Sequence, residues 1–193
     1  MLKTITVAIM FTALSAISAH ADSAFGIEYG GELPSGAVDV DGGFFRVSTP
    51  PKPHSSFETY AVKYHTETGV CFITALSKTF ENDKYGTQAK TEYDKLVAAL
   101  DRKYGPEGDR WEELKAEALW DDADEFAMSL LEGDRNHARW FLPSADSKNE
   151  FNYVQIEINA IDSSKTYIKL DYNNRILNED CTAKISEADN DSL

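Results

Sequence analysis

The chain has 193 residues, of which 33 are acidic and 19 are basic, and its formal net charge at pH 7 is −14. This acidic excess argues against nucleic acid and against an anionic membrane surface as partners, because both require neutralising cations. Motifs of nucleotide-binding proteins, zinc proteases, redox thiol proteins and serine hydrolases are missing from the sequence, so we expect no cofactor and no metal.

Residues 1–21 have the pattern of a cleavable secretory signal peptide. A single cation precedes an apolar run from Ile5 to Ile17, and Ala19 and Ala21 stand at the two positions that signal peptidase reads. The run is too short to span a membrane, and no later segment approaches about 18 consecutive apolar residues. We therefore expect a periplasmic or secreted protein with no integral membrane segment after signal cleavage.

Two alternating patterns predict β-hairpins, one at 57–78 and one at 151–174. In each, apolar side chains recur at every second position on both sides of a short polar turn, and Gly69 supplies the positive φ that the first turn requires. The alternating residues that carry the prediction include Tyr60, Val62, Ile73, Val154, Ile156, Ile158, Ile168 and Leu170. Segments 43–48 and 137–142 give weaker strand signals.

Helices are predicted between the two strand groups. An apolar stripe from Ala89 to Tyr104 predicts a helix at 87–104 that ends at Gly105, and Thr87 has the residue type of an N-cap.

Two shorter helices are predicted at about 110–118 and 123–131. Asp109 with Glu112, and Asp122 with Glu125, have the three-residue spacing of a capping box.

Residues 81–92 have the length of a helix-loop-helix calcium loop, with Gly86 sixth and a glutamate twelfth. Glu81, Tyr85 and Gln88 stand where such a loop needs a short acid, a ligand and an apolar residue. We therefore interpret the segment as a strand-to-helix turn and expect calcium to leave the melting temperature unchanged.

These elements predict a single α+β domain at 22–181, with antiparallel strands packed on one side by the inserted helices, followed by an acidic mobile tail at 182–193. The two cysteines, Cys71 and Cys181, are expected to pair because an exported protein meets an oxidising compartment. Two buried free thiols are the alternative.

A family resemblance rests on five short features: Phe25-Gly26-Ile27 with Gly30, Gly69-Val70-Cys71 in a hairpin, a helix that closes on Lys103-Tyr104-Gly105, a strand with Trp140, and a late Cys181. With them the chain resembles a family of small exported bacterial proteins of unknown function. The resemblance implies the periplasm of a Gram-negative bacterium and implies no activity.

Function is sought in the charge distribution, because no catalytic residue is indicated. Residues 107–134 contain eleven acids and two bases. If residues 110–118 are helical and the helix continues, Glu113, Glu117 and Asp121 form a row of like charges, with Asp124 and Trp120 beside it.

The leading hypothesis is a non-enzymatic interaction or inhibitor module that docks a cationic exported or membrane-associated protein on this acidic helical surface. The competing interpretation of the row is a solvated face. A small-ligand carrier with a cleft between sheet and helices is the second hypothesis, and an enzyme whose carboxylates meet only on folding is the third.

Overall fold

A computed structural model describes residues 23–106, 108–141 and 153–191, so the predicted signal peptide lies outside the described residues. The strands are β1 (Ser23–Ala24), β2 (Ile27–Glu28), β3 (Val38–Asp41), β4 (Phe44–Val47), β5 (Phe57–His65), β6 (Gly69–Ser77), β7 (Arg110–Leu114), β8 (Arg135–Phe141), β9 (Tyr153–Asp162) and β10 (Lys165–Asn173). The helices are α1 (Thr87–Tyr104), a short 3-10 turn η1 (Ala123–Glu125), α2 (Phe126–Leu131) and α3 (Arg175–Asp191).

The larger sheet is antiparallel, with strand order β3-β4-β5-β6-β10-β9-β8-β7. The two predicted hairpins form its centre, as β5–β6 and β9–β10. Gly69 has a φ of 72°, and a side chain there would collide with the backbone of Gly30, so both its conformation and its surroundings require glycine. The α+β prediction is confirmed.

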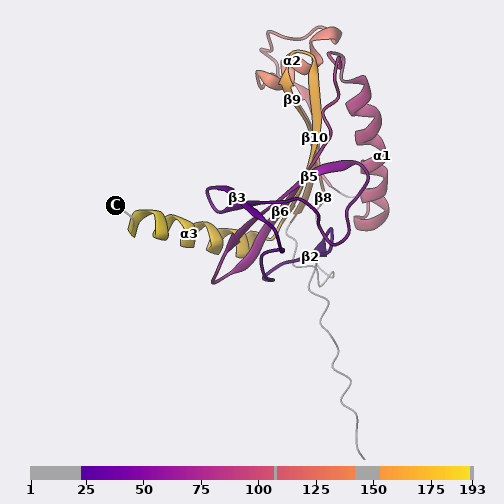
Figure 1. Cartoon of the computed structure of the whole chain (residues 1–193). Coiled ribbons are helices and arrows are strands. Elements are labelled where there is room, and N and C mark those ends of the chain that lie inside the picture. Colours follow the sequence, from indigo (N-terminus) through magenta and orange to yellow (C-terminus); the bar gives the residue numbers. More distant parts are fainter. Residues whose placement is uncertain (1–22, 107, 142–152, 192–193) are drawn as a thin grey trace, which may run out of the picture.

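The helices lie on different faces of the sheet. α1 and α2 pack on β8, β9 and β10, where their apolar side chains meet Val154, Ile156 and Ile168 in the core. α3 contacts β5 and β6. Val62 of β5 points into the core, so the side chain of the next residue, Lys63, points to the other face of the sheet. There Lys63 donates to Thr182 on α3 at 2.5 Å. α3 therefore lies on the opposite face, and it projects away from the sheet while α1 runs alongside it (Figure 1).

The predicted helix at 110–118 is wrong. Residues 110–114 form the edge strand β7, in which Trp111 is paired with Ala138 and Glu113 with Asn136. Asp109 does not cap a helix, and its carbonyl accepts the backbone N–H of Trp140 at 2.9 Å. Pairing with β8 satisfies the backbone groups on one side of this five-residue segment, whereas an isolated helical turn of the same length is unstable.

The second short helix is confirmed as η1 followed by α2. The capping box between Asp122 and Glu125 is formed in both directions.

The start of α1 differs from the prediction in one residue. Gly86, with a φ of 69°, occupies the N-cap, so Thr87 is the first helical residue and does not cap. The buried carboxylate of Asp83 accepts the N–H groups of Gln88 and Ala89 at 2.9 and 3.1 Å instead. An acid three residues before the N-cap thus supplies the acceptors that a helix start needs.

The C-terminal segment also differs from the prediction. Residues 182–191, expected to form a mobile tail, continue α3 to Asp191, and Lys184 forms an ion pair with Glu67 at 3.2 Å. The predicted disulfide is present, and it joins Cys71 of β6 to Cys181 of α3 with both residues fully buried. The covalent link fixes α3 to the sheet, which the sequence pattern did not indicate.

His137 of β8 provides a pH test of the packing between helix and sheet. Its ring lies 4.8 Å from the ring of Tyr93 on α1 and 5.6 Å from that of Phe126 on α2. Burial lowers the pKa of His137 below its ordinary value of 6.5. The unfolded chain therefore binds a proton more readily than the folded one, and stability should fall as pH drops through about 6.5.

The expected result is a decrease in the free energy of unfolding between pH 7 and pH 5 that is smaller in a His137→Gln variant than in the parent. Urea unfolding at both pH values measures it. Equal decreases in the two proteins would show that His137 does not contribute to the pH dependence.

Candidate functional site

The acidic residues singled out in the sequence do not form one helical row. Glu113 is exposed on β7, Glu117 lies in the turn that follows, and Asp121 is exposed before η1. Asp124, in η1, pairs with Lys84 at 2.9 Å, and that hydrogen bond is the main reason why the pKa of Asp124 is lowered. Trp120 is half-buried and donates its backbone N–H to the carboxylate of Asp134 at 3.2 Å.

The acids therefore lack the i, i+4 repulsion that the helical prediction assigned to them. We expect that changing Glu113, Glu117 and Asp121 together to glutamine leaves the free energy of unfolding within about 0.5 kcal/mol of the parent, as for ordinary surface substitutions. Urea denaturation is the measurement. A clear gain in stability would mean that these charges repel one another despite their positions in a strand, a turn and a loop.

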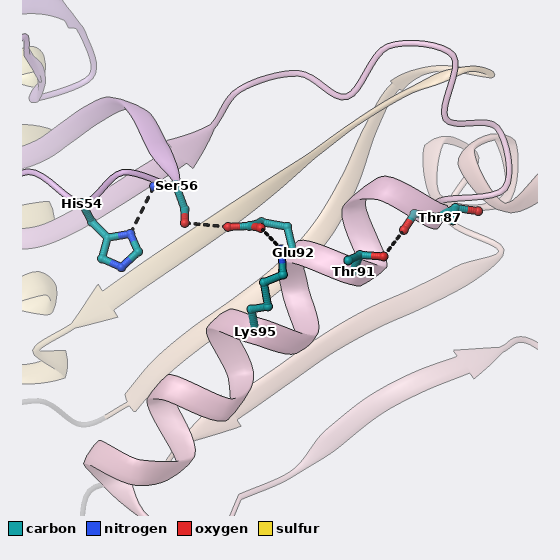
Figure 2. A network of polar contacts seen from close by, with 6 residues as sticks. All are labelled: His54, Ser56, Thr87, Thr91, Glu92 and Lys95. Atoms are coloured by element: carbon teal, nitrogen blue, oxygen red, sulfur yellow. Dashed lines mark hydrogen bonds and ion pairs between the residues drawn. The ribbon is translucent and has the colours of Figure 1, made fainter.

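A groove of about 600 Å³ lies beside the N-terminal half of α1. It is lined by Ser55, Ser56, Glu58, Lys78, Phe80, Thr87, Gln88, Thr91, Glu92 and Lys95. Figure 2 shows Ser56, before β5, pointing toward Glu92 on α1, with Lys95 on the other side of the same carboxylate. The hydroxyl group of Ser56 donates to the carboxylate of Glu92 at 2.7 Å, and the ammonium group of Lys95 donates to the same carboxylate at 3.2 Å.

A serine, a histidine and a glutamate, Ser56, His54 and Glu92, are the residue types of a catalytic triad. Their hydrogen bonds do not connect them as a triad requires. A nucleophilic serine must donate to a histidine base, whereas Ser56 donates its hydroxyl to Glu92. The Nδ1 atom of His54 accepts the backbone N–H of Ser56 at 3.2 Å (Figure 2). The hydrogen bond from Ser56 is also the main cause of the lowered pKa of Glu92. This network holds the start of β5 against α1.

The second candidate is the face of β7–β10 opposite α1 and α2, which we call the open face. Strand register places its side chains in cross-strand rows, and α3, the helix on this side of the sheet, contacts mainly β5 and β6. The open face consists of Trp111, Glu113, Asn136, Ala138, Trp140, Tyr153, Gln155, Glu157, Asn159, Tyr167, Lys169 and Asp171. It is rich in aromatic and amide side chains.

Three aromatic rings form a continuous surface on the open face. Trp140 and Tyr153 are stacked, with centroids 5.8 Å apart and an angle of 20° between the rings. The ring of Trp111 meets Trp140 edge-on at 5.7 Å, and Trp111 is 52% exposed, a high value for a tryptophan in a strand. These rings come from three neighbouring strands, β7, β8 and β9.

Polar groups beside the rings lack partners. Trp140 Nε1 and Asn159 Nδ2 are buried and make no hydrogen bond within the described chain. A buried donor without an acceptor costs about 1–3 kcal/mol, so such groups call for an acceptor such as a water molecule. Trp111 also lines two adjoining hollows of about 350 and 180 Å³, the second of which includes Asn159.

A group of charged residues forms the floor of the open face. Lys169 lies 2.7 Å from Asp171 and 3.3 Å from Glu157, and Thr74 donates to Asp171 at 2.6 Å. Burial raises the pKa of Asp171. Burial alone would lower the pKa of Lys169, but the neighbouring carboxylates of Asp171 and Glu157 together outweigh it, so the pKa of Lys169 is raised. Asp171 is only 5% exposed, and its carboxylate is bonded to both Lys169 and Thr74. It therefore holds these side chains in place and does not reach a ligand.

Comparison with known proteins gives no relative from which function could be inferred. A scan against protein-family models found no match, and searches of curated proteins and of solved structures found no similar chain. The resemblance to small exported bacterial proteins stays a prediction. Within the described ranges, no helix combines the length and apolarity needed to cross a membrane, and no group of three or more His, Cys, Asp or Glu side chains is placed to hold a metal ion.

Proposed function

We propose that the protein is a non-enzymatic carbohydrate-binding module that works in the periplasm or outside the cell and binds its ligand on the open face. The observation that carries this proposal is the exposed ring of Trp111 beside the stacked pair Trp140 and Tyr153, on a sheet face that bears amide side chains. The disulfide between Cys71 and Cys181 supports an oxidising compartment.

Carbohydrate fits the chemistry of this face better than an apolar or a charged ligand. Sugar rings have an apolar face of C–H groups that packs on tryptophan and tyrosine, and hydroxyl groups around the edge that need polar partners. The open face offers both, since Asn136, Gln155 and Asn159 flank the aromatic rings.

The arrangement of Glu157 and Asp171 favours binding over catalysis. Cleavage of a glycosidic bond needs two accessible carboxyl groups on opposite sides of the bond. On the open face, Glu157 and Asp171 share one ammonium group between them, and Asp171 is nearly inaccessible. These groups are arranged to neutralise one another.

Docking of a cationic protein on Glu113, Glu117 and Asp121 is the weaker candidate. Its main support was a row of like charges that would repel one another on a helix. That support is lost because residues 110–114 form a strand. Asp122, Asp124, Glu125 and Asp134 of the same acidic segment have local structural partners.

Replacing Trp111 by alanine should lower carbohydrate affinity at least about tenfold, because a central aromatic anchor contributes about 2 kcal/mol or more. Co-sedimentation with cellulose, chitin and peptidoglycan sacculi, three insoluble polysaccharides of different chemistry, measures binding. Leu119→Ala is the matched control, since Leu119 is 85% exposed and lies outside the open face.

The parent and Leu119→Ala should sediment equally with at least one polysaccharide, and Trp111→Ala should remain in the supernatant. The proposal is wrong if the parent sediments with none of the three, or if Trp111→Ala sediments as the parent does.

A further inference from the structure

β7 is an exposed edge strand of the large sheet. It stands at one end of the strand order, and in the described part of the chain no strand pairs with its outer side. Its first four residues, from Arg110 to Glu113, are all exposed. An edge strand carries backbone N–H and C=O groups without ladder partners, so it can pair with a strand of another molecule.

The pairing of β7 with β8 identifies the backbone groups that point outward. The N–H of Trp140 donates to the carbonyl of Asp109 at 2.9 Å, so the backbone of Asp109 faces β8. In an antiparallel ladder this orientation alternates from one residue to the next. The N–H and C=O groups of Arg110, Glu112 and Leu114 therefore point away from β8, toward the outer side of the strand.

The opposite edge of the sheet has a feature that hinders such pairing, and β7 lacks it. In β3 the register with β4 shifts between Asp39 and Asp41, and irregularities of this kind twist an edge away from a second strand. β7 pairs with β8 through all five residues without a shift, and it contains no proline and no lysine. Only the charges of β7 could keep a second strand away, and their effect depends on the register.

The sequence of β7 is complementary to itself in one antiparallel register. When Trp111 lies opposite Trp111 of a second copy, Arg110 lies opposite Glu112 of that copy, and the two-fold symmetry creates the same pair a second time. Arg110 and Glu112 have outward-pointing backbone groups, so each such pair also exchanges two backbone hydrogen bonds. Opposite charges at facing positions stabilise a sheet.

The two neighbouring registers bring like charges together instead. A register centred on Glu112 places two copies of this carboxylate opposite each other, and a register centred on Glu113 does the same for Glu113. The register centred on Trp111 leaves one kind of like-charged pair, Asp109 with Glu113, and Asp109 lies outside the strand. Charge therefore selects the register centred on Trp111.

Trp111 gains an aromatic neighbour in this register. Its backbone faces β8, so Trp111 and its counterpart in the second copy form a non-hydrogen-bonded pair, in which Cα atoms are about 4.5 Å apart and side chains are close. Both rings point to the same side of the joined sheet, and aromatic cross-strand pairs are stabilising. Because Trp111 is 52% exposed, much of its ring is available for this contact.

We infer that two copies of this chain associate through antiparallel pairing of their β7 strands, centred on Trp111. The pairing joins two eight-stranded sheets into one and places both open faces on the same side. A pair of five-residue strands is short, so the dimer is weak and forms in a concentration-dependent manner. The inference does not rest on carbohydrate binding.

Sedimentation velocity of the protein at concentrations up to millimolar tests the inference. Physiological salt is used, because it screens the repulsion between the exposed charges of two acidic copies beyond about 8 Å. A monomer–dimer equilibrium is expected for the parent. Arg110→Glu alone and Glu112→Arg alone should each weaken the dimer about tenfold, because each change makes both cross-strand pairs like-charged. An equal mixture of the two variants should dimerise as the parent does, because every pair then joins opposite charges.

Cross-linking tests the register without changing these charges. Trp111→Cys should form a disulfide between two copies under mild oxidation, because facing residues of a non-hydrogen-bonded pair lie within disulfide distance. Glu113→Cys is the matched control, on the same strand and the same face. It should stay uncross-linked, because residue 113 faces residue 109 of the second copy.

The inference is overturned if the parent is monomeric at every concentration, if Arg110→Glu dimerises as the parent does, or if Glu113→Cys cross-links as readily as Trp111→Cys. A mixture of the two charge variants that stays monomeric, although circular dichroism shows both to be folded, would also overturn it.

Discussion

Changing Cys71 and Cys181 together to alanine should lower the free energy of unfolding by about 4–5 kcal/mol, the largest effect of any change considered for this protein. The disulfide spans 110 residues of sequence, so it restricts the unfolded chain strongly. Both cysteines are fully buried, and alanine keeps the sites apolar. Urea denaturation of the two proteins without reductant measures the difference.

Reduction supplies the control. Adding reductant should lower the stability of the parent to that of the double variant and leave the variant unchanged. α3 should respond most, because Cys181 of the disulfide lies in this helix, which is also tied to the sheet by exposed contacts such as those of Lys63 with Thr182 and Lys184 with Glu67. Two titratable thiols in the unreduced, unfolded parent would contradict the account.

Asp101→Ala should destabilise the fold by about 3 kcal/mol, because it removes the partner of a buried cation. The side chain of Arg139 on β8 is 2% exposed, and its guanidinium donates a hydrogen bond to one carboxylate oxygen of Asp101 on α1 at 3.0 Å and forms an ion pair with the other at 2.6 Å. A further bond, to the carbonyl of Pro106 at 2.8 Å, would remain. One peptide carbonyl does not compensate a buried charge.

Two controls isolate the cause of that loss. Asp124→Ala breaks the exposed pair with Lys84 and should have a much smaller effect, because water screens both partners. Arg139→Met combined with Asp101→Leu removes both charges and should recover most of the lost stability. If Asp101→Ala and Asp124→Ala cost the same, the pair does not fasten α1 to the sheet.

Elements with a strong period were predictable from sequence, and short segments between them were not. The stripe from Ala89 to Tyr104 fills more than four helical turns, so it determined the extent of α1. Residues 110–114 are too few to separate the helical from the strand period, and their conformation depends on β8, which lies 20 residues further along the chain. Thr87 failed as an N-cap because Asp83, held in place by a bond from Thr166 of β10, satisfies the helix start.

The open face could not be predicted from the sequence for a related reason. Tyr153, Gln155 and Glu157 alternate with apolar residues in the sequence, and the hairpin prediction gave them no role of their own. Their importance depends on β7 and β8, which place Trp111 and Trp140 in adjoining rows. The signal available in the sequence was the excess of aromatic and amide residues at those polar positions, but only the strand register shows that they share one face.

The most direct test of the open face as a carbohydrate site uses the indole N–H signals of a ¹H–¹⁵N NMR spectrum. The chain has three tryptophans, Trp111, Trp120 and Trp140, and each gives one signal. Titration with soluble chito- and cello-oligosaccharides and with peptidoglycan fragments should shift the signals of Trp111 and Trp140 and leave that of Trp120 unchanged. No shift with any of these sugars, or a shift confined to Trp120, would contradict the assignment of carbohydrate binding to the open face.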